Sequence, residues 1–353
     1  MSLSVLSVAY PLAKVSPETA GGAEQILLTI DRALVRRGDR SLVIAAAGSQ
    51  CSGLLIPVRI PAGELDENAK LKARDSFKEA IARVLRSHPV DIIHMHGLDF
   101  YEYLEPTDVP VVVTLHLPLA WYSARMLKAF CNKAELVAVS RTQAASAPSG
   151  LKLHATIPNG IELGDFLPNR KRGRYALILG RICPEKGIHL ALDAAERAGV
   201  PVVLAGKVFE YPEHREYFDR VIRPRLSRSI RFVGAVGKNR KSQLLVGARC
   251  VLLASQADET SSLVAMEALA SGTPVIAWRK GALAEILTDG KTGWLVSSLE
   301  EMTEAIGQTT EISSAECRHE AELRFSSEKM VSDYLSLYRS LVAGNVSREL
   351  QAA

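Results

Sequence analysis

The feature that most limits the possible folds is a regular alternation of short apolar runs and helix-like segments along the whole chain. The run VPVVVTL at 109–115 is apolar at nearly every position, as expected of a parallel strand buried on both faces. After Gly21-Gly22, apolar residues recur every fourth position at Ile26, Ile30 and Leu34, as on one face of a helix. The alternation predicts an α/β protein in which helices cover parallel sheets.

The apolar runs form two series, separated by a segment that fits neither strand nor helix. Residues 163–176 contain Gly, Pro, Asn and several basic residues, and this composition predicts an exposed linker. A length of 353 residues suits two domains of roughly 150 residues each. We therefore expect two Rossmann-like, doubly wound domains facing a cleft. The expected strands are 5–9, 42–46, 91–94, 109–114 and 136–139 in the first series, and 176–179, 202–205, 230–233, 251–254, 274–277 and 294–296 in the second.

The last helix-like segment has an apolar face that needs a surface to pack on. Met330, Tyr334, Leu337 and Leu341 lie on this face at helical spacing. We expect the segment to return to the first domain. The predicted division is an N-terminal domain at 1–165, a C-terminal domain at 166–325 and a returning helix at 326–353.

Composition and charge exclude several classes of protein. Hydrophobic residues make up 47% of the chain and charged residues 23%, which is ordinary for a soluble globular protein. A net charge of +4 is too small to indicate nucleic-acid binding. The five scattered cysteines suggest reduced thiols, and neither a secretory signal nor a membrane span is expected. These features predict a cytoplasmic protein, and they leave open whether it is a monomer or a homodimer.

A basic segment at 71–86 leaves one alternative open for localisation. Its charges surround a narrow apolar side, so it is either a solvated helix face or a weak peripheral contact with anionic lipid at the inner face of the membrane.

Two glycine-containing loops follow expected strands and could bind an anion. Gly21-Gly22 precedes the first helix, and the pair is either a plain helix start or a site where backbone N–H groups approach a phosphate. In GRICPEKG, at 180–187, Arg181 and Lys186 project beside a helix N-terminus and suit a diphosphate. The alternative is a surface ion pair between Glu185 and Lys186, which would contribute only about 0–1 kcal/mol.

Two glutamates flank the start of another predicted helix, in the segment ETSSLVAME. If that helix begins near Ser262, Glu259 and Glu267 lie on one side of it, a little over two turns apart. A carboxylate among apolar residues is costly unless something binds it, and sugar or ribose hydroxyls are suitable partners. A partly exposed glutamate in an amphipathic helix remains the alternative.

Three histidines lie at or near strand ends of the first series. His94 and His96 end one strand and His116 follows the next, so two neighbouring strands deliver imidazoles to the same rim. Polar caps are the alternative role for them. Neither these histidines nor an acidic DxD cluster predicts a metal site.

Taken in order, these segments resemble the retaining glycosyltransferases of the GT-B fold, family 4 (glycosyl transferases group 1). The resemblance extends from about residue 5 to residue 343. The matching segments are GGAE, DIIHMH, VVTLH, VAVS, IPNGIE, GRICPEKG, VVLAG, IRFVGAV, the two glutamates, SGTPVIA and SDYLSLYRSL.

The resemblance implies roles for individual residues. It makes the first domain the acceptor domain and the second the donor domain, and it assigns Arg181, Lys186, Glu259 and His116 to catalysis. Arg181 and Lys186 would bind the donor diphosphate, Glu259 would approach the donor sugar, and His96 would lie on the acceptor side. The residues that it assigns to donor and nucleotide binding are Gly22, Lys207, Val233, Gly234, Ser262, Leu263, Val264 and Glu267.

The implied reaction moves a hexose-type sugar from a nucleoside diphosphate sugar, of UDP or GDP type, to a hydroxyl of a glycan, lipid-linked or small-molecule acceptor. It requires no metal and no cofactor, and the departing phosphate acts as the base. Most members carry Gly-Phe-Gly after the first glutamate, whereas this chain has Thr260-Ser261-Ser262, which predicts an altered donor preference. The alternatives are a GT-B sugar-nucleotide epimerase and a non-catalytic nucleotide-sugar-binding partner of another transferase.

Overall fold

The computed structural model of the protein describes residues 2–19, 21–60, 66–168 and 172–352, with side chains described as far as residue 344. Its contacts divide the chain into two compact units. The first unit consists of Met1–Pro158 together with Lys329–Ala353, and the second is Asn159–Glu328. The sequence pattern placed the first boundary after residue 165, whereas the contacts place it after Pro158.

The first unit is built on a parallel sheet of seven strands in the order β3-β2-β1-β4-β5-β6-β7. The order changes direction between β1 and β4, so the sheet is doubly wound, as predicted. The edge strand β3 and the two-residue β7 were not predicted. The strands are β1 Ser4–Val8, β2 Arg40–Ala46, β3 Leu54–Val58, β4 Ile92–Met95, β5 Val111–Leu115, β6 Glu135–Ala138 and β7 Ala155–Thr156.

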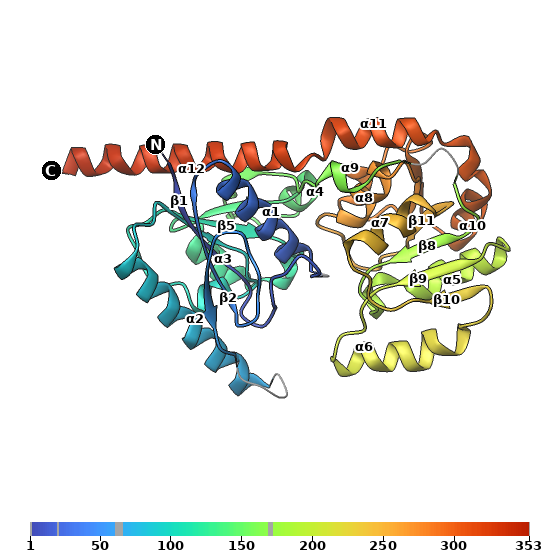
Figure 1. Cartoon of the computed structure of the whole chain (residues 1–353), viewed down its shortest axis with the longest axis horizontal. Coiled ribbons are helices and arrows are strands. Elements are labelled where there is room, and N and C mark those ends of the chain that lie inside the picture. Colours follow the sequence, from blue (N-terminus) through green and yellow to red (C-terminus); the bar gives the residue numbers. More distant parts are fainter. Residues whose placement is uncertain (1, 20, 61–65, 169–171, 353) are drawn as a thin grey trace. The chain divides into compact units, whose positions relative to one another are not determined.

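Amphipathic helices pack against this sheet (Figure 1). The predicted face of α1 is confirmed, since Ile26, Ile30 and Leu34 are all buried. Helix α2 begins where the Asp66 side chain accepts a hydrogen bond from the Ala69 N–H, an N-cap that satisfies one free donor. The helices with residues in the first unit are α1 Gly22–Arg36, α2 Glu67–Ser87, α3 Ala124–Phe130, α4 Arg141–Ala145 and α12 Ser327–Ala352.

The C-terminal helix α12 packs on the first unit, which confirms the predicted return. The side chains of Tyr334 and Tyr338 are buried, and their hydroxyls reach Thr114 on β5 and His94 on β4. These bonds join residues more than 200 positions apart in the sequence. In the part of the chain that the structure describes, no helix combines the length and the apolar character needed to cross a bilayer.

The second unit repeats the architecture with a six-stranded parallel sheet in the order β10-β9-β8-β11-β12-β13. The direction changes between β8 and β11. The predicted strands 176–179 and 202–205 coincide with β8 and β9. The strands are β8 Ala176–Leu179, β9 Val202–Ala205, β10 Ile230–Phe232, β11 Cys250–Leu253, β12 Val275–Trp278 and β13 Gly293–Val296.

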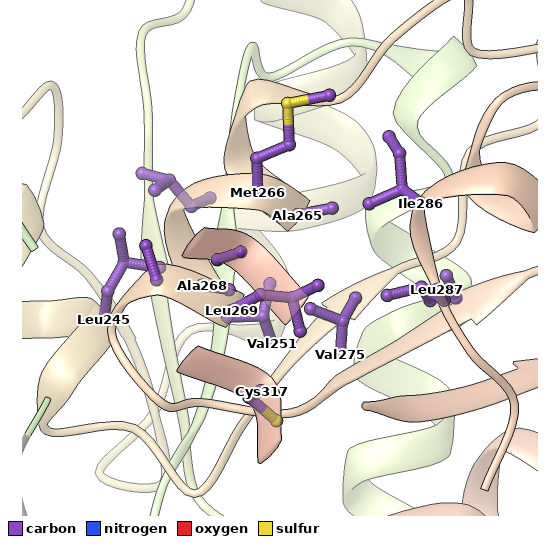
Figure 2. Packing of buried hydrophobic residues seen from close by; sticks show 14 of the residues in the cluster. Leu245, Val251, Ala265, Met266, Ala268, Leu269, Val275, Ile286, Leu287 and Cys317 are labelled. Carbon is purple, nitrogen blue, oxygen red and sulfur yellow. The ribbon is translucent and has the colours of Figure 1, made fainter. Parts of the chain in front are cut away.

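Figure 2 shows how one face of the second sheet is covered. Val251 of β11 and Val275 of β12 pack with Leu269 of α8 and Cys317 of α11 in one buried cluster. Burying such side chains is the main stabilising contribution to a unit of this kind. The helices of this unit are α5 Ile188–Arg197, α6 Pro212–Tyr217, α7 Lys238–Val246, α8 Leu263–Ala270, α9 Leu283–Ile286, α10 Leu299–Gln308 and α11 Ser314–Arg324.

The expected exposed linker is wrong in part. Phe166 is buried in the core of the second unit, and the Arg172 guanidinium donates hydrogen bonds to the carbonyl oxygens of Thr309 and Ile312. These contacts make both residues part of the folded second unit. The central residues of the predicted linker, 169–171, lie outside the described part of the chain.

Candidate functional site

The sequence-predicted residues of the second unit gather at the carboxyl ends of its strands. The loops after β8 and β11 lie on either side of the point where the strand order changes direction, which is where open α/β sheets bind ligands. Two contacts join these loops. The Gln256 N–H donates to the Glu185 carbonyl oxygen at 2.7 Å, and Lys186 Nζ lies 2.6 Å from Glu259 Oε1.

A glycine allows the two loops to approach each other. Gly187 follows Lys186 and has a φ of +58°, in the left-handed region that favours glycine. A Cβ atom at this position would lie 2.0 Å from the carbonyl oxygen of Ala254, at the end of β11. Any other residue would therefore push the loops apart and separate Lys186 from Glu259.

The pairing of Lys186 with Glu259 overturns one reading of the sequence. Lys186 does not form the simple surface pair with Glu185, because its Nζ is bonded to Glu259. The side chain of Lys186 is 30% exposed and that of Glu259 only 14%. Water and salt therefore weaken the attraction between the two charges less than they would in a surface pair. The Ser255 hydroxyl donates a further hydrogen bond to the same oxygen, Glu259 Oε1, which leaves Oε2 for another partner.

The neighbouring loops bring further predicted residues to the same rim. The Ile182 N–H, next to Arg181, donates to the Lys207 carbonyl oxygen at 3.0 Å, which joins the loops after β8 and β9. The Gly206 N–H donates to the Gly234 carbonyl oxygen at 2.8 Å, which joins the loops after β9 and β10. Val233, beside Gly234, is 38% exposed. Arg181, Lys186, Lys207, Val233, Gly234 and Glu259 thus share one end of the second sheet.

Helix α8 begins where the sequence predicted. The Ser262 hydroxyl caps it by accepting a hydrogen bond from the Ala265 N–H, and Leu263 and Val264 form the first turn. Glu267, one turn further on, is 3% exposed. Burial raises the pKa of its carboxyl, and the charge of nearby Lys241 partly offsets this effect.

Lys241 is a site residue that the sequence reading missed. Its Nζ lies 2.5 Å from Glu267 Oε1, and its side chain is 18% exposed. Lys241 belongs to α7 and Glu267 to α8, so the pair joins two helices across 26 positions of sequence. A nearly buried carboxylate requires a partner, and that requirement is the only signal that could have pointed to a cation here.

The first unit brings its three histidines together. His96 Nδ1 and His116 Nε2 are 3.0 Å apart, and the rings of His94 and His96 have centroids 4.0 Å apart. His94 lies beneath α12, where Thr114 bonds its Nε2 and Tyr338 bonds its Nδ1. His96 and His116 therefore meet at the end of the sheet, as predicted, whereas His94 is fully buried among hydrogen-bonding partners.

All three histidines are held in the neutral form. Burial lowers the pKa of His94 and of His116 to about 3, and it lowers that of His96 well below the usual value. A neutral imidazole donates through one nitrogen and accepts through the other. His96 Nε2 is buried and has no hydrogen-bond partner among the described residues, so it can interact with a hydroxyl that a ligand supplies.

The glycine pair of the first unit lies at the start of α1. Gly21 is the N-cap residue, without a side-chain cap, and Gly22 is the first residue of the helix. The N–H groups of a helix's first turn have no partner within the helix, so they can bind an anion. Gly22 begins the helix that follows β1 along the chain, and β1 is one of the two strands at the change of direction.

Comparisons with known proteins agree with this architecture. A family model described as Glycosyl transferases group 1 matches residues 164–322, and one described as Glycosyltransferase Family 4 matches residues 20–165. The D-inositol 3-phosphate glycosyltransferase of Corynebacterium urealyticum is 29% identical over 249 residues, which are 60% of this chain and 57% of that relative. The chain thus matches little more than half of that relative's length.

Two solved structures are similar over nearly the whole chain. AviGT4, a glycosyltransferase involved in avilamycin A biosynthesis, has a TM-score of 0.73 and 25% identity, with 97% of this chain and 98% of that chain covered. The HepE protein of Anabaena, solved with UDP and glucose, has a TM-score of 0.72 and 19% identity, with 96% of this chain and 100% of that chain covered.

Proposed function

We propose the following reaction for this chain, which belongs to the glycosyltransferases of family 4 with the GT-B fold. It transfers a hexose-type sugar from a nucleoside diphosphate sugar to a hydroxyl group of a glycan, lipid-linked or small-molecule acceptor. The anomeric configuration is retained, and no metal is required. The bound UDP and glucose of the Anabaena protein make a UDP-sugar the first donor to test.

The observation that carries this proposal is the contact between Lys186 and Glu259 at the change of strand direction. It brings a cation and a carboxylate together, 2.6 Å apart, at the position where sheets of this order bind nucleotides. Lys186 has three donors, and one is used by Glu259, so two remain for phosphate oxygens. The second cation, Arg181, lies in the same loop.

These cations act on the charge that develops as the sugar leaves. Cleavage of the bond between the sugar and the diphosphate places negative charge on the leaving oxygen. Arg181 and Lys186 stabilise this charge more in the transition state than in the bound substrate, so they lower the barrier of the chemical step. The departing phosphate then accepts the proton of the acceptor hydroxyl, which attacks on the face that the leaving group occupied.

The two glutamates bind hydroxyl groups in this proposal. Glu259, fixed by Lys186 and Ser255, accepts hydrogen bonds from the donor sugar. Glu267 binds the ribose through its second carboxylate oxygen, while Lys241 neutralises the first. Lys241 is thus a positioning residue that keeps a buried carboxylate charged in the apolar start of α8.

In this proposal, the histidines of the first unit contact the sugars rather than the diphosphate. Because they are neutral, they do not repel a positively charged, oxocarbenium-like sugar. His96 and His116 share one hydrogen bond, so its direction sets whether His96 Nε2 donates to a ligand or accepts from it. His116 contacts the reacting sugar, and His96 offers Nε2 to an acceptor hydroxyl.

Thr260-Ser261-Ser262 adjusts the donor preference. Ser261 Oγ is buried and has no partner among the described residues, so it can bind a polar substituent of the donor sugar. Ser262 is already used as the N-cap of α8. Ser261 is therefore the residue of this segment whose replacement by glycine should change the ranking of donors.

The test is a product assay over UDP-, GDP- and ADP-sugars, with and without a panel of hydroxyl acceptors. Formation of a glycosylated acceptor with retained configuration, read by NMR, is the expected result. Release of free UDP and a C2-epimerised sugar without an acceptor would instead identify an epimerase. Donor binding with neither hydrolysis nor transfer would identify a non-catalytic binding protein and overturn the proposal.

A further inference from the structure

Three side chains that could ligate a metal lie together in the second unit and have no role in the reaction proposed above. Cys183 and Glu185 belong to the loop after β8, and His214 belongs to α6. Their candidate ligand atoms (a thiol sulfur, a carboxylate oxygen and a ring nitrogen) all lie within 4.8 Å of one another. The Cys183 thiol donates a long hydrogen bond, 3.7 Å, to the carbonyl oxygen of Arg181 in its own loop.

The histidine of this group has an unused buried atom. His214 is 8% exposed, and its Nδ1 has no hydrogen-bond partner in the described part of the chain. A buried polar atom without a partner is destabilising, so a group that binds it would remove this cost. Tyr211 and Phe209 pack against the ring and restrict its orientation.

We propose that Cys183, Glu185 and His214 form a binding site for Zn²⁺ that ties the loop after β8 to α6. Sulfur, imidazole and carboxylate are the three protein ligands that zinc prefers, and a thiolate does not suit Mg²⁺ or Ca²⁺. On binding, the Cys183 thiol loses its proton to solvent, and the resulting thiolate and one carboxylate balance the two positive charges of the ion. Three protein ligands leave the fourth tetrahedral position to water.

The spacing of the three groups is compatible with closure around an ion. Ligand atoms of a tetrahedral zinc site lie roughly 3.5 Å apart, given zinc–sulfur and zinc–nitrogen bonds of about 2.3 and 2.1 Å. The distances between the ligand atoms, at present within 4.8 Å, must therefore shorten by roughly 1.3 Å at most. Glu185 is exposed, so an ion can reach its carboxylate from solvent.

The position of the site gives the ion a structural consequence. Cys183 and Glu185 lie between Arg181 and Lys186 in the sequence, and the Glu185 carbonyl oxygen already accepts the Gln256 N–H. A bound ion would hold this loop from the α6 side, while Lys186 and Gln256 hold it from the β11 side. Metal binding thus stabilises the second unit without participating in the transfer reaction.

The experiment is a titration of the metal-free full chain with Co²⁺, and separately with Zn²⁺ by calorimetry. Co²⁺ bound to a thiolate gives a charge-transfer absorption that reports the cysteine ligand directly. The proposal predicts one ion per chain in the wild type, with that absorption, and a rise in melting temperature with excess Zn²⁺. Cys183→Ser, Glu185→Gln and His214→Gln should each weaken binding at least about 100-fold, since loss of outer contacts alone costs about 10–100-fold.

Two matched controls carry the same chemical changes at other positions. Cys131→Ser changes a thiol of the first unit, and His319→Gln changes an exposed histidine of α11. Both should bind the metal as the wild type does. Because Cys183 is buried, its variant is checked by circular dichroism, and the exposed Glu185→Gln keeps the test valid if Cys183→Ser folds poorly. Unchanged metal affinity in Glu185→Gln and His214→Gln, or no binding by the wild type, would overturn the site.

Discussion

The two units have the same strand order around the change of direction, but their strand ends carry opposite kinds of chemistry. In the first unit, β4 and β5 lead to His96 and His116, which are neutral and hydrogen-bonded to each other. In the second unit, β8 and β11 lead to Lys186 and Glu259, which form an ion pair. The topology therefore determines where a ligand can bind, while the residues at the strand ends determine what kind of ligand it is.

Under the proposed function, the difference follows from what each rim would bind. A diphosphate brings negative charge, so the second unit needs cations that stay partly hydrated, and the Lys186 side chain is 30% exposed. Sugar hydroxyls bring no charge, so the first unit can bury its imidazoles deeply. Burial keeps them neutral, because a charged ring would lose its hydration.

The largest expected effect concerns the buried ion pair of the second unit. Lys241→Met leaves Glu267 charged and unpaired, and breaking such a pair costs about 3–5 kcal/mol. We expect the free energy of unfolding, measured with urea, to fall by that amount near pH 7. The loss should shrink as the pH falls, because protonated Glu267 carries no charge, and its pKa is already raised by burial.

The double variant Lys241→Met/Glu267→Gln is the control for this change. It removes the uncompensated charge and should recover much of the lost stability. Equal stability of Lys241→Met and the wild type would mean that the charge of Glu267 does not need Lys241 as a partner. It would contradict the description of the second unit's rim as one of paired charges.

The second effect concerns the cation proposed for the diphosphate. Lys186→Ala should lower turnover about 100- to 1,000-fold, the usual cost of one lost contact to developing charge, while circular dichroism stays unchanged. Lys291→Ala is the matched control, because Lys291 pairs with Glu316 and Glu320 in the same unit, away from the loops at the strand ends. Similar turnover in the two variants would remove Lys186 from the donor site.

The third effect tests whether α12 supports the histidines of the first unit. Tyr338→Phe removes the hydroxyl bonded to His94 Nδ1 and leaves a buried nitrogen without a partner, at a cost of about 1–3 kcal/mol. Tyr211→Phe, at a tyrosine that is 47% exposed, should change the free energy of unfolding very little. If Tyr338→Phe and Tyr211→Phe changed the free energy of unfolding equally, the bond between Tyr338 and His94 would not contribute to the packing of α12.

The last expected effect, small within any one pH unit, is a pH dependence of opposite sign in the two units. His94 and His116 have pKa values near 3, below the usual value of 6.5, so the unfolded chain binds protons that the folded chain does not. Between pH 6.5 and pH 3, each should reduce the stability of the first unit by up to about 1.4 kcal/mol per pH unit as the pH falls.

In the second unit, the raised pKa of Glu267 acts in the other direction. Just above the usual glutamate pKa of 4.5, the folded chain binds a proton that the unfolded chain has released, so this group favours folding as the pH falls. Hydrogen exchange read peptide by peptide can follow the units separately. The β4 and β5 peptides should lose protection first on acidification, and simultaneous loss in α8 would contradict the contrast.

Local patterns were enough to predict most of the sheet. Strands buried on both faces give continuous apolar runs, which is why 202–205 was predicted with the same limits as β9. The edge strand β3 was missed because it is partly exposed and contains Pro57, and proline is tolerated only at such edges. The contacts divide the chain at Pro158 rather than at the expected residue 165 because Ile161 bridges to Ser326, a contact that no local pattern encodes.

The candidate site was predictable where it follows the strand ends. Because the carboxyl ends of parallel strands meet on one edge, the loops with Lys186 and Glu259 could be placed together from the sequence. Lys241 could not be found in this way, because it reaches Glu267 from a neighbouring helix. The burial of His94 depends on Tyr338, 244 positions away, so only the folded chain reveals it.

The most direct test of the account is calorimetric titration of UDP and GDP into the wild type, Lys186→Ala and Lys291→Ala. The account predicts that the wild type and Lys291→Ala bind one of these nucleotides equally well. Lys186→Ala should bind it at least about 10-fold more weakly, as expected for one lost hydrogen bond to a charged group. Equal affinity in Lys186→Ala, or no binding of either nucleotide by the wild type, would contradict the claim that the carboxyl ends of β8 and β11 hold the donor diphosphate.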